Sequence, residues 1–195
     1  MKPRQRTCKV KAEGCQGKYM PFNSLQSCCY NAKCVLENKR IQDAKKAKRE
    51  ARAYRQKHKS HGKWVQEAEA EVRRYVRERD ARDKQPCISC GRHEWQLKHD
   101  SRGGIWDAGH YLGKGSHPEH RFDVRQIWRQ CKSCNRDKSG NQIRYRKGLI
   151  ARMGISYVEW LEGPHPAKKY TIEELQQIKQ HYAKLANELE KARVA

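Results

Sequence analysis

Several features on which most folded proteins rely are scarce in this sequence. Only 36% of the residues are hydrophobic, phenylalanine occurs twice, and the mean hydropathy is -1.17. No apolar run reaches the length that a transmembrane helix needs, and the basic first residues lead into no apolar segment typical of a secretory signal. We therefore expect no membrane partner and a cytoplasmic location. A core this small also needs metals or disulfides for support.

Acidic residues are scarce as well. The 44 Lys and Arg residues exceed the 22 Asp and Glu residues, which leaves a net charge of +22. A polyanion is the natural partner for such a chain. Because no amphipathic helix combines bulky apolar residues with the basic stretch, we favour DNA over an anionic membrane surface. We expect no organic cofactor.

Cysteines are plentiful, and five of the nine lie within residues 1–36. Cysteine clusters in a reducing compartment bind metal more often than they form disulfides. A zinc site could take Cys8 and Cys15 from one side, and Cys34 with either Cys28 or Cys29 from the other. Our working set is Cys8, Cys15, Cys29 and Cys34, and the alternative is a group of scattered reduced thiols.

The region 37–84 is basic and is predicted to be helical. Eleven Lys and Arg residues between Lys39 and Lys63 stand against two acidic ones, in a composition that favours helix but supplies no apolar stripe. We interpret this stretch as a solvated helix that orders on DNA, or as a charged linker. Beyond a break at 60–62, apolar residues at helical spacing predict a packed helix over 64–83.

The chain also ends in predicted helices, over 142–153, over 156–162 and from Thr171 onward. Thr171 and Glu174 form a capping-box pattern ahead of a long apolar stripe. Such a stripe usually packs within its own chain, although a dimer contact is the alternative.

Two C-x-x-C pairs, 87–90 and 131–134, give the strongest pattern in the sequence. Their four thiolates, from Cys87, Cys90, Cys131 and Cys134, can surround one Zn²⁺ in a closed tetrahedral site, so this metal should be structural. Two redox motifs are the alternative, but neither pair lies in a βαβ pattern.

The residues around these pairs resemble a known family. The matching stretches read PCISCG at 86–91, WDAGHY at 106–111 and RQCKSCNRDKSGN at 129–141. Together they resemble the His-Asn-His endonucleases, and more closely the lambdoid phage NinG family, also called Rap, which are recombination endonucleases. The core is similar to phage endonuclease VII. The resemblance implies an α+β fold, in which a treble-clef zinc site and a ββα-metal nuclease core occupy 85–154. Residues 1–36 would form a zinc finger, and 155–195 a helical region.

The same resemblance suggests how the chemistry is divided. Phosphodiester hydrolysis needs an activated water and a counter-charge for the transition state. His110 would accept a proton from the water, and Asp107 and Asn135 would offer oxygen ligands to Mg²⁺ or Mn²⁺, although Asp107 could instead cap the turn. Gln126 stands where many relatives carry an orienting Asn, and its amide can make the same hydrogen bonds. His117 and His120 are expected in a loop near DNA.

Basic residues crowd this segment and are expected to contact phosphates. They are Lys114, Arg121, Arg125, Arg129, Lys132, Arg136, Lys138, Arg144, Arg146 and Lys147. The resemblance implies a metal-dependent endonuclease that cuts branched recombination intermediates, of Holliday junction or D-loop type, in the cytoplasm of a bacterial host. Symmetric cutting of a junction would require a homodimer. The alternative is a non-catalytic, zinc-stabilised DNA-binding protein with a recombination or regulatory role. A zinc deaminase is disfavoured, because no H-x-E precedes Pro86.

Overall fold

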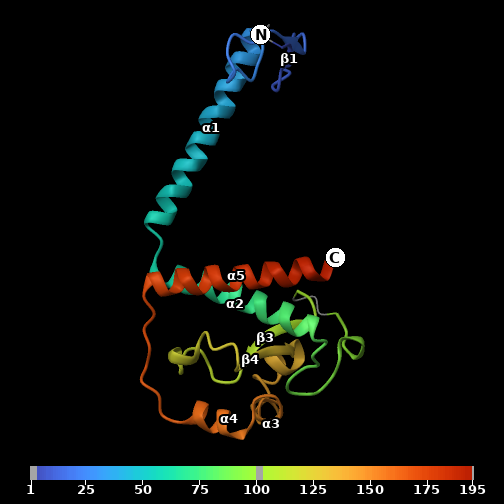
Figure 1. Cartoon of the computed structure of the whole chain (residues 1–195), viewed down its shortest axis with the longest axis vertical. Helices are drawn as coiled ribbons and strands as arrows, with labels where there is room; N and C mark the ends of the chain where they lie inside the picture. The colour runs from blue at the N-terminus through green and yellow to red at the C-terminus, as the bar shows by residue number, and fades with distance from the viewer. Residues whose placement is uncertain (1–3, 100–102, 195) are drawn as a thin grey trace. The chain divides into compact units, whose positions relative to one another are not determined.

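The computed structural model describes residues 4–99 and 103–194, and the chain divides into two compact units, residues 1–59 and 60–195. Figure 1 shows the helices and two small sheets that make up the α+β fold.

The N-terminal unit combines a small cysteine-lined core with one long helix. Strands β1 (Arg6–Thr7) and β2 (Lys18–Tyr19) pair antiparallel, and α1 spans Ala32–Lys57. The Asn31 side chain caps this helix by accepting a hydrogen bond from the backbone N–H of Cys34 at 3.2 Å. Within α1, all of whose residues are described, only Cys34 is buried. The predicted solvated basic helix is therefore present, and it begins inside the cysteine-rich segment.

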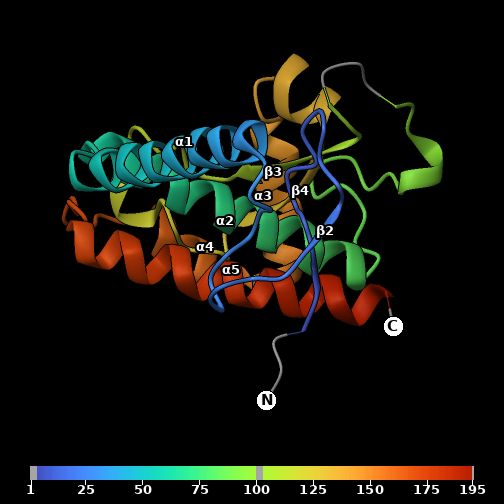
Figure 2. The ribbon, with the colours of Figure 1, turned by 90° about the horizontal axis from the view of Figure 1, so that it is seen from above.

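The second unit is built on a β-hairpin covered by helices. Strands β3 (Trp106–His110) and β4 (Ile127–Cys131) pair antiparallel, with Trp106 opposite Cys131 and His110 opposite Ile127. Helix α2 (His61–Arg82) lies between this hairpin and α5 (Ile172–Val194), as Figures 1 and 2 show. Apolar side chains from all three layers form one core, made by Ala68, Val72, Val76, Ala108, Phe122, Ile127 and Leu175.

The other side of the hairpin packs on α3 (Gln142–Met153) and α4 (Ile155–Glu162). Their core contains Ile88, Tyr145, Leu149, Val158 and Leu161. Gly148 permits a close approach here, since a Cβ at this position would lie 2.1 Å from the Ile88 carbonyl oxygen. Short helical turns at Glu94–Gln96, Pro118–His120 and Ser133–Asp137 complete the unit.

The predicted helices agree closely with the observed ones. The helix over 142–153 has the predicted bounds, α2 begins three residues before the predicted start at 64, and α4 begins one residue early. The predicted capping box is present, because the Thr171 backbone N–H donates to Glu174 Oε2 and the Glu174 N–H donates to Thr171 Oγ1. None of the helices in 4–99 and 103–194 combines the length and hydrophobicity needed to cross a bilayer.

Candidate metal centres and active site

The two C-x-x-C pairs meet in the second unit. The sulfur atoms of Cys87, Cys90, Cys131 and Cys134 all lie within 4.8 Å of one another. The first pair comes from the turn after α2, Cys131 ends β4, and Cys134 lies in the turn that follows. The predicted grouping is confirmed, and the site can hold a zinc ion.

Hydrogen-bond donors surround these sulfurs. The Cys131 backbone N–H donates to Cys87 Sγ at 3.3 Å, and Arg92 Nε donates to Cys90 Sγ at 3.4 Å. The pKa of the Cys87 thiol is lowered, first by its hydrogen bond with the Cys131 thiol and then by backbone donors. The pKa values of Cys131 and Cys134 are instead raised, first by the hydrogen bond with Cys87 and by burial, respectively, so a bound zinc ion would be needed to hold all four sulfurs as thiolates.

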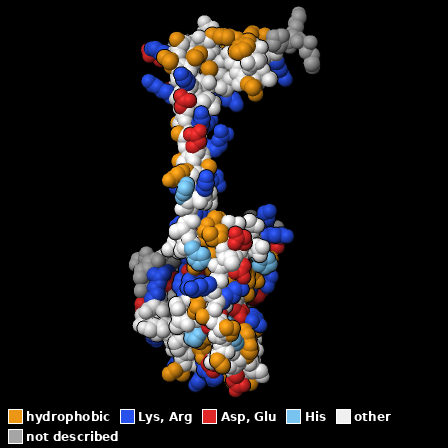
Figure 3. Space-filling model, turned by 90° about the vertical axis from the view of Figure 1, so that its left-hand side faces the viewer, with side chains coloured by type: hydrophobic (Ala, Val, Ile, Leu, Met, Phe, Trp, Pro, Cys, Tyr) orange, Lys and Arg blue, Asp and Glu red, His pale blue; other side chains and the backbone are white. Residues whose placement is uncertain are grey.

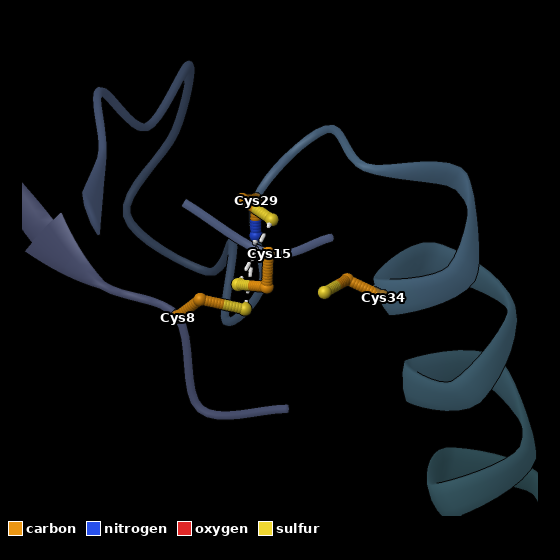
Figure 4. A group of neighbouring side chains, drawn as sticks. All are labelled: Cys8, Cys15, Cys29 and Cys34. Carbon is orange, nitrogen blue, oxygen red and sulfur yellow. Dashed lines mark hydrogen bonds between the residues drawn. The ribbon is translucent and has the colours of Figure 1, made fainter. Parts of the chain in front are cut away.

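The N-terminal unit contains a second group of four cysteines. The sulfurs of Cys8, Cys15, Cys29 and Cys34 lie within 4.8 Å of one another. Figure 4 shows these four side chains gathered between the loops and the start of α1. The backbone N–H groups of Gly17 and Cys29 donate to Cys15 Sγ and Cys8 Sγ, at 3.3 and 3.4 Å. Cys28 is buried but is not a member of the group, so the structure selects Cys29 of the two alternatives. This group too can hold a zinc ion.

Three of the four predicted catalytic residues, Asp107, His110 and Asn135, line one cavity of about 520 Å³, whereas the fourth, Gln126, is buried outside it. Asp107 and His110 reach it from β3, and Asn135 reaches it from the turn after β4. The other side chains on this cavity include four cations, contributed by Arg73, Arg77, Lys114 and Arg136. A cavity that combines an imidazole, oxygen donors and positive charge suits a phosphodiester.

His110 ends β3 and is held by one hydrogen bond. Its Nε2 lies 3.2 Å from the carbonyl oxygen of Arg121. Because a carbonyl only accepts, Nε2 must carry the proton and Nδ1 is the acceptor in the neutral ring. The pKa of His110 is lowered, first by burial and then by the positive charges of Lys114 and Arg73. The imidazole is therefore neutral near pH 7, as a general base must be.

Asp107 is enclosed by donors. Arg136 donates to both carboxylate oxygens at 2.8 and 3.0 Å, and Asn135 Nδ2 donates to Oδ2 at 2.9 Å. Lys132 Nζ lies 3.4 Å from Oδ1. Burial would raise the pKa of Asp107, but the hydrogen bonds from Arg136 and Asn135 outweigh it and lower the pKa. Asp107 is thus a carboxylate at neutral pH, and a metal ion would have to compete with Arg136 for it.

Gln126 connects the two ends of the loop between β3 and β4. It is fully buried; its Oε1 accepts from the Leu112 N–H and its Nε2 donates to the His120 carbonyl oxygen, both at 2.7 Å. Both groups of the amide thus hydrogen-bond to the backbone of the loop. These two bonds hold the loop in place at His120. The next residue, Arg121, accepts the hydrogen bond from His110.

Two buried acidic residues were missed by the sequence analysis. Glu69 is 6% exposed and binds Lys114 Nζ at 2.6 Å and Arg121 Nη1 at 2.7 Å, beside the cavity. Asp80 is fully buried and accepts from the Arg129 backbone N–H at 2.7 Å. Both stand at helical spacing within the apolar stripe of α2, and a carboxylate in such a stripe was the available indication.

The residues that were predicted to contact DNA phosphates differ in their exposure to solvent. Arg129 and Lys132 are each 4% exposed, and Arg129 binds Asp80 and Glu94 while its guanidinium covers the Trp106 ring at 3.8 Å. The structure therefore does not support phosphate contacts for these two. Arg121, Arg125, Arg136 and Arg146 are ion-paired, to Glu69, Asp123, Asp107 and Glu162. Lys138, Arg144 and Lys147 are solvent-exposed, as are Arg125 and Arg136 among the ion-paired residues. Figure 3 shows Lys and Arg side chains spread over one face of the molecule.

His120 also differs from its expected place. It is 5% exposed and packs against the rings of Trp160 and His165, so it belongs to the interior of the loop. His117 remains half-buried beside Glu119.

Comparison with known proteins identifies the family. Residues 1–192 match the family model described as Bacteriophage Lambda NinG protein. Protein ninG of Escherichia phage 933W is 34% identical over 98% of this chain and 97% of its own length. The ninG proteins of Salmonella phage P22 and Escherichia phage lambda are 41% and 40% identical over 67% of this chain, and the matched part spans 59% of each. No solved structure matches. The chain belongs to the bacteriophage NinG family.

Proposed function

We propose that this NinG-family chain is a divalent-metal-dependent endonuclease that cuts branched DNA. The observation that carries the proposal is the shared cavity of Asp107, His110 and Asn135, rimmed by four cationic side chains. The preference for branched recombination intermediates rests on the resemblance of the motifs to recombination endonucleases. We also propose that each group of four cysteines holds a structural Zn²⁺.

In this proposal His110 is the general base. Its Nε2 is engaged with the Arg121 carbonyl oxygen, so Nδ1 is left to accept a proton from the attacking water. Fixing one ring nitrogen determines both the tautomer and the direction of the other. A positioned base of suitable pKa contributes about 10²- to 10⁴-fold to the rate.

The oxygen donors of the cavity fit a hard divalent cation. Asp107 and Asn135 would hold Mg²⁺ or Mn²⁺, which stabilises the charge that develops on the phosphate and on the leaving oxygen. Four donor atoms already surround the Asp107 carboxylate. Arg136 is 40% exposed, so its guanidinium can leave Asp107 and bind the phosphate instead. DNA would then complete the metal site.

The remaining cations would hold the DNA backbone on either side of the cut. Lys114 lines the cavity, while Lys138, Arg144 and Lys147 are exposed on the segment that follows the second cysteine pair. Contacts to phosphates position a duplex without reading its sequence. Cutting both strands of a four-way junction would use a homodimer, which sedimentation of the chain with junction DNA would detect.

A specific observation favours the second candidate, a non-catalytic DNA-binding protein. The Arg136–Asp107 ion pair neutralises the proposed metal ligand in the absence of DNA. If this pair persists on DNA, the cavity is a phosphate-binding pocket without a metal.

A nicking assay separates the two functions. Zinc-loaded protein is mixed with a four-way junction, a D-loop or linear duplex, with and without Mg²⁺ or Mn²⁺. We expect metal-dependent cutting that is fastest on the branched molecules, and a loss of about 100-fold or more in His110→Ala at unchanged DNA affinity. His181→Ala, an exposed histidine of α5, is the matched control. Binding without cutting by the wild type under all of these conditions would establish the non-catalytic function instead.

A further inference from the structure

A second cavity is lined in part by the loop that holds His110. It has a volume of about 780 Å³, and residues 119–125 form one wall. The other walls come from the end of α4, from residues 165–170 and from α5, all within the second unit. Its aromatic lining consists of His120, Phe122, Trp160, His165, Tyr170 and Tyr182, and we call it the aromatic pocket.

The rings of the pocket pack against one another and differ in exposure, with His120 and Phe122 buried and Trp160 exposed. Trp160 is 48% exposed although it is the largest ring present. Its centroid lies 4.6 Å from His165 and 5.4 Å from His120, and the Arg125 guanidinium lies 5.4 Å from it. Aromatic and guanidinium faces held in a fixed arrangement are the surfaces on which unpaired nucleobases stack.

The charges of the pocket suit a base better than a phosphate. Arg125 is paired with Asp123 at 2.7 Å, and Lys168 is paired with Glu174 at 3.0 Å. Two of the three cations that line the pocket are therefore ion-paired to the chain's own carboxylates, and the third, Lys169, is exposed. A ring-lined cavity of several hundred Å³, in which most of the charges are paired, accommodates a flat, uncharged ligand.

Three consecutive residues connect this pocket to the proposed active site. His120 lines the pocket and offers its carbonyl oxygen to Gln126, Arg121 offers its carbonyl oxygen to His110, and Phe122 lines the pocket again. Neighbouring Cα atoms are about 3.8 Å apart. The wall of the pocket therefore lies one residue away from the Arg121 carbonyl oxygen that holds His110. DNA held at His110 would therefore pass close to the pocket.

We propose that the aromatic pocket binds one unpaired nucleobase of the branched DNA, a few nucleotides from the cut phosphate. The proposal rests on the proposed function, and it supplies a means by which branched DNA is preferred, because a base in continuous duplex is already stacked and paired. Extruding such a base costs a few kcal/mol, whereas a base at a branch or flap is already free. The pocket would therefore favour DNA that contains an unpaired base over continuous duplex.

Abasic substitution tests this inference. The affinity of the full-length, zinc-loaded protein is measured for a flapped duplex in which each unpaired nucleotide in turn is replaced by an abasic one. The buffer contains no Mg²⁺ or Mn²⁺, so that binding alone is read. One position should weaken wild-type binding by about 5- to 100-fold, the range of a single base stacked on an aromatic ring. Trp160→Ala should bind intact and abasic flaps within twofold of each other, and Trp160→Phe should restore most of the discrimination.

A tryptophan outside the pocket provides the control variant. Trp95→Ala, which removes a 78% exposed tryptophan outside the pocket, should discriminate as the wild type does. Zinc content and circular dichroism confirm that each variant is folded. Equal wild-type affinity for every abasic flap, or equal discrimination by Trp160→Ala and wild type, overturns the proposal and leaves a peptide as the better occupant. Because cleavage is not read, the pocket can stand if the nuclease proposal fails, and the reverse holds as well.

Discussion

Removing the hydroxyl of Tyr145 should destabilise the hairpin that carries His110. The side chain is fully buried in α3 and joins both strands. Its oxygen accepts from the Trp128 backbone N–H at 3.1 Å and lies 2.8 and 2.9 Å from the carbonyl oxygens of Gly109 and Gln126. One donated hydrogen thus serves two acceptors, and Gly109 immediately precedes His110.

The magnitude follows from the groups that lose their partner. Tyr145→Phe leaves one N–H and at least one carbonyl without a hydrogen bond in a site that water does not reach. Each such group costs about 1 to 3 kcal/mol, so we expect the free energy of unfolding to fall by about 2 to 6 kcal/mol. Tyr157→Phe, which removes one half-buried hydrogen bond to Asp123, should cost about 1 kcal/mol.

Urea unfolding followed by tryptophan fluorescence measures this change. All five tryptophans lie in residues 60–195, so the signal reports on the unit that contains the hairpin. The midpoint should fall markedly in Tyr145→Phe and only slightly in Tyr157→Phe, with unchanged slopes. Equal midpoints for the two variants would refute the reasoning that the Tyr145 hydroxyl unites the two strands.

Three further predictions concern the zinc site of the second unit, the protonation of His110 and the ion pairs of Glu69. Cys131→Ser should reduce the zinc content from two ions per chain to one and unfold the second unit; two ions by elemental analysis would contradict the assignment. The cleavage rate should rise with pH through the lowered pKa of His110, because the base acts unprotonated, with a midpoint below the ordinary value of about 6.5; a midpoint above 7 would exclude His110 as the base. Glu69→Gln weakens the anchorage of Lys114 and Arg121, so single-turnover cleavage should slow about tenfold at unchanged DNA affinity; wild-type rates would rule out a positioning role for Glu69.

Local patterns were sufficient to predict much of this molecule. The helices were predicted because their apolar residues recur at helical spacing, and the spacing of Cys87, Cys90, Cys131 and Cys134 was compatible with one tetrahedral ion. The capping box at Thr171 is likewise a matter of residues three apart. Each of these features depends on a few neighbouring positions, which is what a sequence displays directly.

Features that depend on distant partners could not be predicted in this way. Arg129 looked like any other cation of its segment, and only the fold brings Asp80 and Trp106 to it. The choice of Cys29 over its neighbour depends on how one turn closes. The aromatic pocket collects rings from 120 to 182, which share no spacing. Whether a charged or aromatic side chain is buried depends on contacts between residues that are far apart in the sequence. Composition and local spacing therefore do not predict it.

The central claim is that His110 and Asp107 act together on one phosphate, and a double-mutant cycle of cleavage tests it most directly. Single-turnover rates on one junction would be measured for wild type, His110→Ala, Asp107→Asn and the double variant, each at saturating protein. Residues that act as a unit give non-additive losses, so the double variant should be about as slow as the slower single variant. Losses that multiply, or wild-type cutting by either single variant, would contradict the claim.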